Sequence, residues 1–134
     1  MFSSTYRIID ANLNRAREGL RVIEDWCRFV IENQKLSADV KSIRHQILQI
    51  AQVSGWTKDN LLPHRNTTED VGVHNSTAHE YIRDNEKEIL HANFSRVQES
   101  LRVLEEYGKR DNIGHLFESL RYSLYTLEKN VMEF

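Results

Sequence analysis

Small and apolar side chains recur at helical spacing along most of the chain, and one proline and five glycines rarely interrupt them. Projected at about 100° per residue, a stripe within 6–33 falls on one face. Its members are Ala16, Gly19, Ile23, Trp26, Cys27 and Val30. A second helix is predicted over 38–54, with Ser37 as its N-cap and Gly55 as its stop. Its stripe is Val40, Ile43, Ile47, Ile50 and Ala51.

The second half of the chain repeats this pattern after a polar interval. The segment 55–76 contains Pro63, Gly72 and many Asn, Thr and Asp residues, which predicts a long loop of the kind that is functional or disordered. Thr77 and Glu80 form a capping-box pattern, so helix is expected to restart there. Further helices are predicted over 86–109 and over 112–132, the latter capped by Asp111. The stripe of the last helix is Leu116, Leu120, Leu124 and Leu127.

An internal repeat is the strongest signal in the sequence. ANLNRAREGLRVIE (11–24) aligns without a gap with ANFSRVQESLRVLE (92–105), with eight identities in fourteen positions. Ile43-Arg44 further resembles Leu120-Arg121. The simplest account is a duplicated helical hairpin, because one hairpin cannot bury its apolar face alone. We therefore predict one all-α domain over 1–134, a four-helix bundle with a pseudo-two-fold. The repeat units are about 5–54 and 86–132, joined by the loop at 55–76.

Several polar residues repeat although apolar spacing does not explain them: Asn12 and Asn93, Arg15 and Arg96, and Glu18 and Glu99. They form an i, i+3, i+6 ladder in each copy, so neighbouring side chains are within reach of one another. One interpretation is a structural network of partly buried ion pairs, which spacing alone favours. The other is an anion site, in which two Arg forks bind phosphate oxygens, the Asn amides add donors and the Glu residues hold the forks.

Two other features of the repeat bear on packing. Gly19 and its counterpart Ser100 are small, which would let two helices, or a helix and a ligand, approach closely. Arg21 and Arg102 each precede a Glu by three residues, Glu24 and Glu105 respectively. These are interpreted as solvated surface pairs, and Arg17 and Arg28 as further surface residues.

The loop 64–72 carries hydroxyl, basic and acidic groups that suit a lid over a phosphorylated ligand, although on local grounds an ordinary polar turn is the favoured explanation. His64, His74 and His79 have no recognised metal spacing. The nucleotide-binding patterns G-x-x-x-x-G-K-[ST] and G-x-G-x-x-G are absent, as is the hydrolase pattern G-x-S-x-G. Any phosphate chemistry must therefore use side chains of a helical bundle.

The composition of the chain excludes further classes of function. A net charge of −2 leaves no basic excess for a nucleic acid or an anionic membrane. No apolar run exceeds three residues, which argues against a membrane-spanning helix or a signal peptide. The single Cys27 cannot form an internal disulfide. We expect a soluble, cytoplasmic protein. Five leftover apolar positions would permit a homodimer: Phe2, Trp56, Leu61, Leu62 and Phe134.

Three longer stretches of the sequence resemble the signatures of one family. IIDANLNRAREGLRVIEDWCRF (8–29) is similar to the opening signature of a small family in thiamine biosynthesis, whose members occur alone or fused ahead of thiamine-phosphate synthase. LHANFSRVQESLRVLEEYGK (90–109) resembles the family's second signature. RNTTEDVG (65–72) resembles its R-[DN]-T-x-x-D-V-G loop. Together these strings span essentially the whole chain in the expected order.

The resemblance implies a hydroxymethylpyrimidine phosphate kinase. Such an enzyme uses ATP and Mg²⁺ to phosphorylate 4-amino-5-hydroxymethyl-2-methylpyrimidine phosphate to the diphosphate, the substrate of thiamine-phosphate synthase. It also makes the anion site the favoured interpretation of the ladders. A non-catalytic domain that binds the pyrimidine diphosphate or associates with thiamine-phosphate synthase is the alternative, and a helical interaction module with purely structural ladders is a third possibility.

These considerations give a set of candidate site residues. Arg15, Arg96 and Asp70 are expected to be catalytic, Asn12, Asn93, Arg65 and Thr67 to bind substrate or nucleotide phosphate, and Glu18 and Glu99 to support the Arg residues. The resemblance implies Asp in many relatives at the position of Asn66. Asp70 is therefore the carboxylate expected to help hold Mg²⁺.

Overall fold

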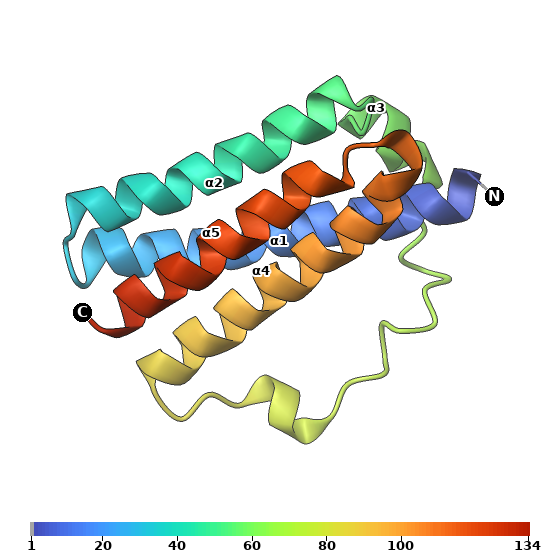
Figure 1. Cartoon of the computed structure of the whole chain (residues 1–134). Coiled ribbons are helices and arrows are strands. Elements are labelled where there is room, and N and C mark those ends of the chain that lie inside the picture. The colour runs from blue at the N-terminus through green and yellow to red at the C-terminus, as the bar shows by residue number, and fades with distance from the viewer. Residues whose placement is uncertain (1) are drawn as a thin grey trace.

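The computed structural model describes residues 2–134, and four long helices account for most of them (Figure 1). They are α1 (Phe2–Phe29), α2 (Gln34–Val53), α4 (Glu86–Gly108) and α5 (Gly114–Met132). A short α3 (Lys58–Leu61) and 3₁₀ helices at Leu62–His64, Ala78–Tyr81 and Lys109–Asp111 complete the described secondary structure. The part of the chain that is described contains no strand. The all-α prediction is confirmed.

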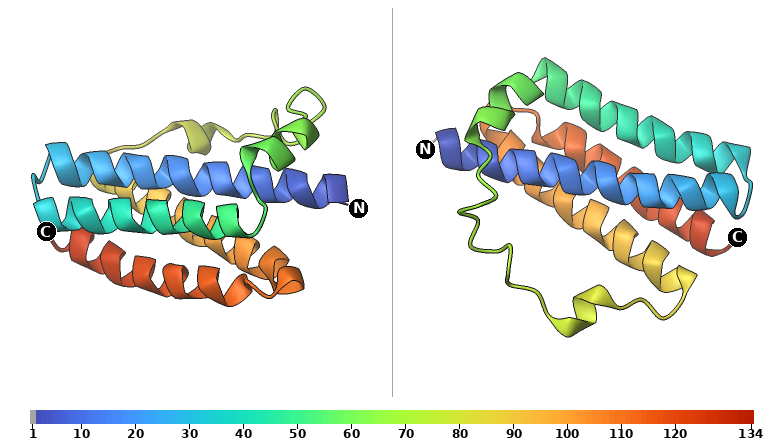
Figure 2. Two further views of the ribbon diagram at one scale, coloured as in Figure 1. Left: turned by 90° about the horizontal axis from the view of Figure 1, so that it is seen from above. Right: turned by 180° about the vertical axis from the view of Figure 1, so that it is seen from behind.

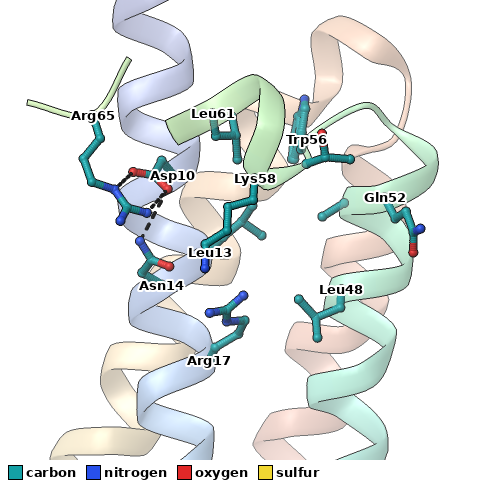
Figure 3. Close-up of a pocket in the computed structure, with 12 residues that line it drawn as sticks. Asp10, Leu13, Asn14, Arg17, Leu48, Gln52, Trp56, Lys58, Leu61 and Arg65 are labelled. Atoms are coloured by element: carbon teal, nitrogen blue, oxygen red, sulfur yellow. Dashed lines mark hydrogen bonds and ion pairs between the residues drawn. The ribbon is translucent and has the colours of Figure 1, made fainter. Parts of the chain in front are cut away.

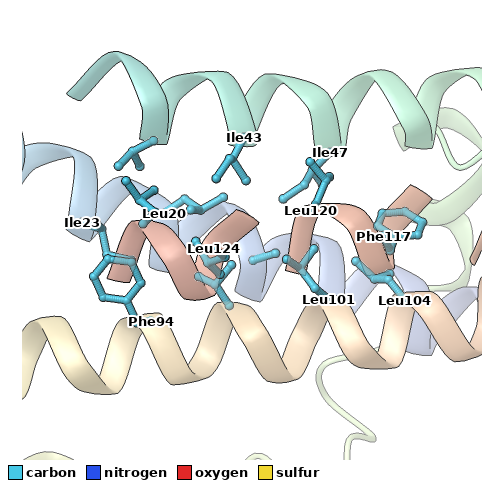
Figure 4. Close-up of a cluster of buried hydrophobic side chains, with 14 of the residues drawn as sticks. Leu20, Ile23, Ile43, Ile47, Phe94, Leu101, Leu104, Phe117, Leu120 and Leu124 are labelled. Atoms are coloured by element: carbon cyan, nitrogen blue, oxygen red, sulfur yellow. The ribbon is translucent and has the colours of Figure 1, made fainter. Parts of the chain in front are cut away.

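The long helices pack as two antiparallel pairs. α1 contacts α2 and α4, and α5 contacts α4 and α2. Both turned views in Figure 2 show α1 and α4 crossing side by side. One core runs along the molecule, and its largest fully buried side chains include Phe94, Phe117, Leu20 and Leu101 (Figure 4). Each helix contributes a stripe, as the periodicity predicts. Two predicted stripe members are corrected, because Val30 lies beyond the end of α1 and is exposed, and Leu116 is also exposed.

The structure corrects several predicted helix ends. α1 ends at Phe29 rather than near 33, and Glu32 adopts a left-handed φ of 48° in the turn. The Asn33 side chain then accepts a hydrogen bond of 2.9 Å from the Leu36 amide, so Asn33 caps α2 in place of Ser37. α5 begins at Gly114, because Asn112 adopts a left-handed φ of 61° after the 3₁₀ turn that contains Asp111. Gly55 ends α2 as predicted, with φ 75°.

The small residue of α1 marks a close helix contact, as predicted. A Cβ added to Gly19 would lie 2.7 Å from Val97 Cγ2 and 3.2 Å from the Asn93 carbonyl oxygen. Its counterpart Ser100 is also buried. The backbones of α1 and α4 therefore approach closely at this point.

The interpretation of Glu24 and Glu105 as surface residues is wrong. Both side chains are only 5% exposed, and each forms an ion pair with the other helix of its hairpin. Glu24 Oε1 lies 3.3 Å from Arg44 Nη2, and Glu105 Oε1 lies 3.0 Å from Arg121 Nη2. The partners Arg21 and Arg102 are exposed, as expected. The two hairpins thus carry equivalent buried pairs, which needed tertiary packing to be seen.

The segment between α2 and α4 has two parts. Residues 57–64 fold back as α3 and a 3₁₀ turn, which the sequence did not predict. Trp56 and Leu61, expected as leftover surface positions, are core residues at 4% and 3% exposure. Leu62 and Phe134 are exposed, whereas the side chain of Phe2 lies outside the described residues. Residues 65–85 run along the outside of α1 and α4 with one short 3₁₀ helix after Thr77. No helix among the described residues is long and apolar enough to cross a membrane.

Candidate functional site

A cavity of about 360 Å³ opens between α1, α2 and α3, and we refer to it as the apolar hollow (Figure 3). Its apolar lining consists of Leu13, Leu48, Ala51, Trp56 and Leu61, and its polar lining of Asp10, Asn14, Arg17, Gln52, Thr57, Lys58 and Arg65. Arg17 and Lys58 reach into the space between α1 and α2 from two sides. The hollow therefore combines an apolar surface with three cations, namely Arg17, Lys58 and Arg65.

Local structure explains why the hollow exists. Gly55 turns the chain out of α2, and the Asn60 side chain donates a 2.7 Å hydrogen bond back to the Gly55 carbonyl oxygen. Trp56 then stacks on Phe117 of α5, with ring centroids 5.7 Å apart and planes at 10°. The stack anchors the start of α3, so Lys58 is held above α1.

A second cavity of about 250 Å³ adjoins the first, and we refer to it as the polar hollow. It lies between the N-terminal half of α1 and the start of the loop, and is lined by Arg7, Asp10, Ala11, Asn14, Arg65, Asn66, Thr67 and Asp70. Arg7 Nη2 donates to the Asn66 carbonyl oxygen at 3.3 Å. The loop residues predicted as site residues, namely Arg65, Thr67 and Asp70, therefore meet in one place.

An ion pair forms the wall between the two hollows. Arg65 Nε and Nη2 donate to the two carboxylate oxygens of Asp10, each at 2.7 Å, and Asn14 Nδ2 lies 3.4 Å from Asp10 Oδ1. All three residues line both hollows. The hydrogen bond with Asp10 raises the pKa of Arg65 above its ordinary value, so the guanidinium stays charged. This bidentate geometry also fixes the plane of the Arg65 fork.

The loop offers one carboxylate, Asp70, to a metal ion. Asp70 Oδ1 accepts the Gly72 amide at 2.8 Å, which holds the carboxylate within a tight turn. Among the described residues, no three His, Cys, Asp or Glu side chains form a metal-binding cluster. Mg²⁺ is commonly bound by one or two carboxylates together with substrate phosphates. Asp70 is suited to be the single protein carboxylate of such a site.

The two predicted ladders lie elsewhere. Asn12 is buried and donates to the Ile8 carbonyl oxygen at 2.9 Å, and Asn93 donates to Ile89 at 2.8 Å. Each Asn therefore binds its own helix rather than the next rung of the ladder. The charged rungs are exposed and form no ion pair in the described structure: Arg15, Glu18, Arg96 and Glu99.

Neither of the two hollows contains a ladder residue. Arg96 lines a third, wide hollow beside Ala78–Tyr81, together with His79 and His91. Arg15 and Arg96 are therefore not brought into one cleft with Arg65 and Asp70. A role for the ladders in phosphate binding stays a prediction.

Sequence reasoning missed eight polar or aromatic lining residues: Arg7, Asp10, Asn14, Arg17, Gln52, Trp56, Thr57 and Lys58. One signal could have found part of them. The four α1 residues of the apolar hollow all differ between the copies, with Asp10, Leu13, Asn14 and Arg17 matched by His91, Phe94, Ser95 and Gln98. The copies also differ at the core positions Ala16, Gly19 and Ile23. Residues shared by both copies serve packing common to both hairpins, such as Glu24 and Glu105. Polar residues that differ between the copies, such as Asp10 and Arg17, were therefore the available signal for this hollow.

The second hairpin matches only one of the two hollows. Glu88, His91 and Ala92 of the third hollow are the counterparts of Arg7, Asp10 and Ala11 of the polar hollow, whereas the position equivalent to the apolar hollow is occupied by side-chain contacts. Gln98, the counterpart of Arg17, donates to Glu128 Oε1 at 2.8 Å, and His91 Nδ1 lies 3.5 Å from Glu128 Oε2. These side chains connect α4 to α5 where the first hairpin is open. The internal symmetry is therefore broken at the apolar hollow, whereas the polar hollow has a counterpart beside α4.

Comparison with known proteins identifies the family of the chain. Residues 7–130 match the model of the ThiD2 family. The chain is 46% identical over 128 residues to a thiamine-phosphate synthase of Synechocystis sp., covering 94% of this chain and 36% of that protein. It is 45% identical over 129 residues to a thiamine-phosphate synthase of Nostoc punctiforme, covering 95% and 35%. No solved structure matches. The chain thus spans about a third of the length of these curated relatives, and it belongs to the ThiD2 family.

Proposed function

We propose that this chain is a kinase of thiamine biosynthesis that transfers the γ-phosphoryl group of ATP to 4-amino-5-hydroxymethyl-2-methylpyrimidine phosphate. The observation that carries the proposal is the pair of adjoining hollows that share the wall of Asp10 and Arg65. Such a reaction brings two anionic ligands together, and phosphoryl transfer depends mainly on positioning and on neutralising charge. Two neighbouring cavities with a shared cation meet that need.

The proposed reaction needs few further groups from the protein. An oxygen of the substrate's phosphate attacks the γ-phosphorus, and the bond from that phosphorus to the bridging oxygen breaks, so its electron pair leaves with ADP. The second pKa of a phosphate monoester is about 6, so the attacking group is largely a dianion at pH 7.5 and needs no general base. Mg²⁺, when bound with the nucleotide, neutralises part of the phosphate charge, and Asp70 is the residue suited to hold it. Arg65, Arg17 and Lys58 supply the remaining positive charge.

The internal repeat supports a related proposal about origin. We infer that the two hairpins of a four-helix bundle arose by duplication, because eight of fourteen positions are identical and both hairpins carry a Glu–Arg pair. After duplication, the first copy gained the polar side chains of α1 that line the hollows. The second copy then serves mainly as packing for the first.

A second candidate function follows from the length of the relatives. Because the chain covers about 35% of proteins named thiamine-phosphate synthase, it is also suited to be an associated domain that binds the pyrimidine diphosphate without turnover. Incubation with ATP, Mg²⁺ and the pyrimidine monophosphate separates the two. We expect ADP and the diphosphate in equal amounts. Diphosphate binding without any ADP would instead support the associated domain.

A further inference from the structure

We infer that the apolar hollow binds the pyrimidine monophosphate and that the polar hollow binds the terminal phosphates of the nucleotide, with Arg65 between them. This inference rests on the proposed kinase function and assigns each ligand to its subsite. It places both ligands on the first hairpin, rather than one on each copy of the repeat.

The apolar hollow has the chemistry of a flat heterocycle with an anionic tail. Its volume of about 360 Å³ lies near the lower end of the range for small-molecule sites, which suits a single ring with one phosphate. Leu13, Leu48 and Trp56 offer apolar surface to the faces of a ring. The amides of Asn14 and Gln52 can both donate and accept, as an aminopyrimidine edge requires.

The cations of the apolar hollow sit where the tail would lie. Arg17 comes from α1 and Lys58 from α3, and both extend into the space beside Leu13 and Leu48 (Figure 3). Neither side chain has an ion-pair partner in the described structure. Two unpaired cations beside an apolar cavity favour a phosphate monoester over a neutral ligand.

The polar hollow lacks the surface that a base would need. Ala11 is its one apolar residue, and the rest are charged or hydrogen-bonding groups. Arg7, Arg65 and the Thr67 hydroxyl can bind phosphate oxygens, and Asp70 is beside them for the accompanying Mg²⁺. A chain of phosphates fits this lining, whereas the ring of the pyrimidine substrate does not.

The shared wall then defines the place of transfer. Arg65 lines both hollows, so its guanidinium can contact the attacking phosphate on one side and the γ-phosphoryl group on the other. Asp10 is a positioning residue, because it binds both arms of the Arg65 fork at 2.7 Å. In the second hairpin the Gln98–Glu128 contact takes the place of the apolar hollow, so among the described residues we place this junction on the first hairpin.

Calorimetric titration of the full chain tests the assignment. The two probes are the pyrimidine monophosphate alone and the non-hydrolysable nucleotide adenylyl imidodiphosphate with Mg²⁺. Loss of one charge-assisted contact should weaken binding about tenfold to a hundredfold. We expect Arg17→Gln to weaken binding of the pyrimidine monophosphate by this factor and binding of the nucleotide by less than about twofold. Each ligand should occupy one binding site. Arg7→Gln and Thr67→Ala should show the reverse.

Arg28→Gln is the matched control, since Arg28 lies on α1 far from both hollows and stacks over Phe29 at 4.8 Å. It should change neither affinity. Trp26→Phe leaves Trp56 as the one tryptophan, whose fluorescence should respond to the pyrimidine monophosphate. The assignment would be overturned if Arg17→Gln weakened nucleotide binding and Arg7→Gln weakened binding of the pyrimidine monophosphate, or if each ligand bound at two sites. The kinase proposal would stand in either case. If the wild-type chain binds neither probe, both proposals fail.

Discussion

At the scale of single residues, Arg65 carries the most demanding role, because it alone among the cations faces both hollows. Arg65→Lys keeps a positive charge but loses the bidentate fork that Asp10 holds. We expect kcat to fall at least about tenfold, since removing one clamp on a transferring phosphoryl group costs several kcal/mol. The melting temperature should change little, because the Arg65 side chain is 38% exposed. Steady-state kinetics and a thermal melt measure the two quantities, and an unchanged kcat would contradict the role.

Cys27 gives a prediction about pH. Burial, followed by the nearby charge of Glu24, raises the pKa of the Cys27 thiol to about 11 from 9.0. A raised folded-state pKa means that the neutral thiol stabilises the fold below pH 9, and that this stability is lost as the pH rises towards 11. Between pH 8 and pH 11, the unfolding free energy of Cys27→Ala should therefore fall by about 2 kcal/mol less than that of the wild-type protein. Urea unfolding at both pH values tests this, and parallel losses would refute it.

At the scale of elements, each hairpin is held by a buried carboxylate that bridges its two helices. Removal of Arg44 leaves Glu24 buried with only its exposed partner Arg21. We expect Arg44→Met to cost about 3 kcal/mol of unfolding free energy. Arg21→Met is the matched control on the same carboxylate, and should cost less than about 1 kcal/mol because Arg21 is 58% exposed. Equal losses in urea unfolding would show that burial of the pair does not matter.

The linker between the hairpins should show two levels of protection against amide hydrogen exchange. Trp56 and Leu61 anchor 56–64 in the core, whereas the backbone of 65–85 makes few contacts beyond local turns. We expect slow amide exchange in 58–62 and fast exchange in 65–76. Nucleotide and pyrimidine monophosphate together should slow exchange in 65–72, as a lid over the polar hollow requires.

Hydrogen exchange with and without both ligands measures this difference. Residues 78–81 serve as an internal control, since they lie away from both hollows and should exchange equally fast in the two states. Unchanged protection in 65–72 would contradict the lid.

At the scale of the whole molecule, the sequence predicts the helices better than the site. Apolar periodicity locates all four long helices, because burial of one face imposes a regular spacing. Helix ends depended on single residues such as Asn33 and Asn112, whose side-chain and backbone geometry is decided locally. The hollows escaped prediction because their walls join α1 to residues about 40 to 55 positions later. The repeat directed attention to identical residues, whereas the cavity is lined by residues that differ between the copies.

The central claim is that phosphoryl transfer occurs at the hollows of the first hairpin rather than at the repeated ladders. Arg17→Gln and Arg15→Gln make the same charge change two residues apart on α1, but only Arg17 lines a hollow. The direct test is the initial rate of ADP formation from ATP, Mg²⁺ and the pyrimidine monophosphate for wild type and both variants. The account predicts that Arg17→Gln lowers kcat/KM at least about tenfold and that Arg15→Gln stays within about twofold of wild type. Loss of activity in Arg15→Gln with normal turnover in Arg17→Gln would contradict it.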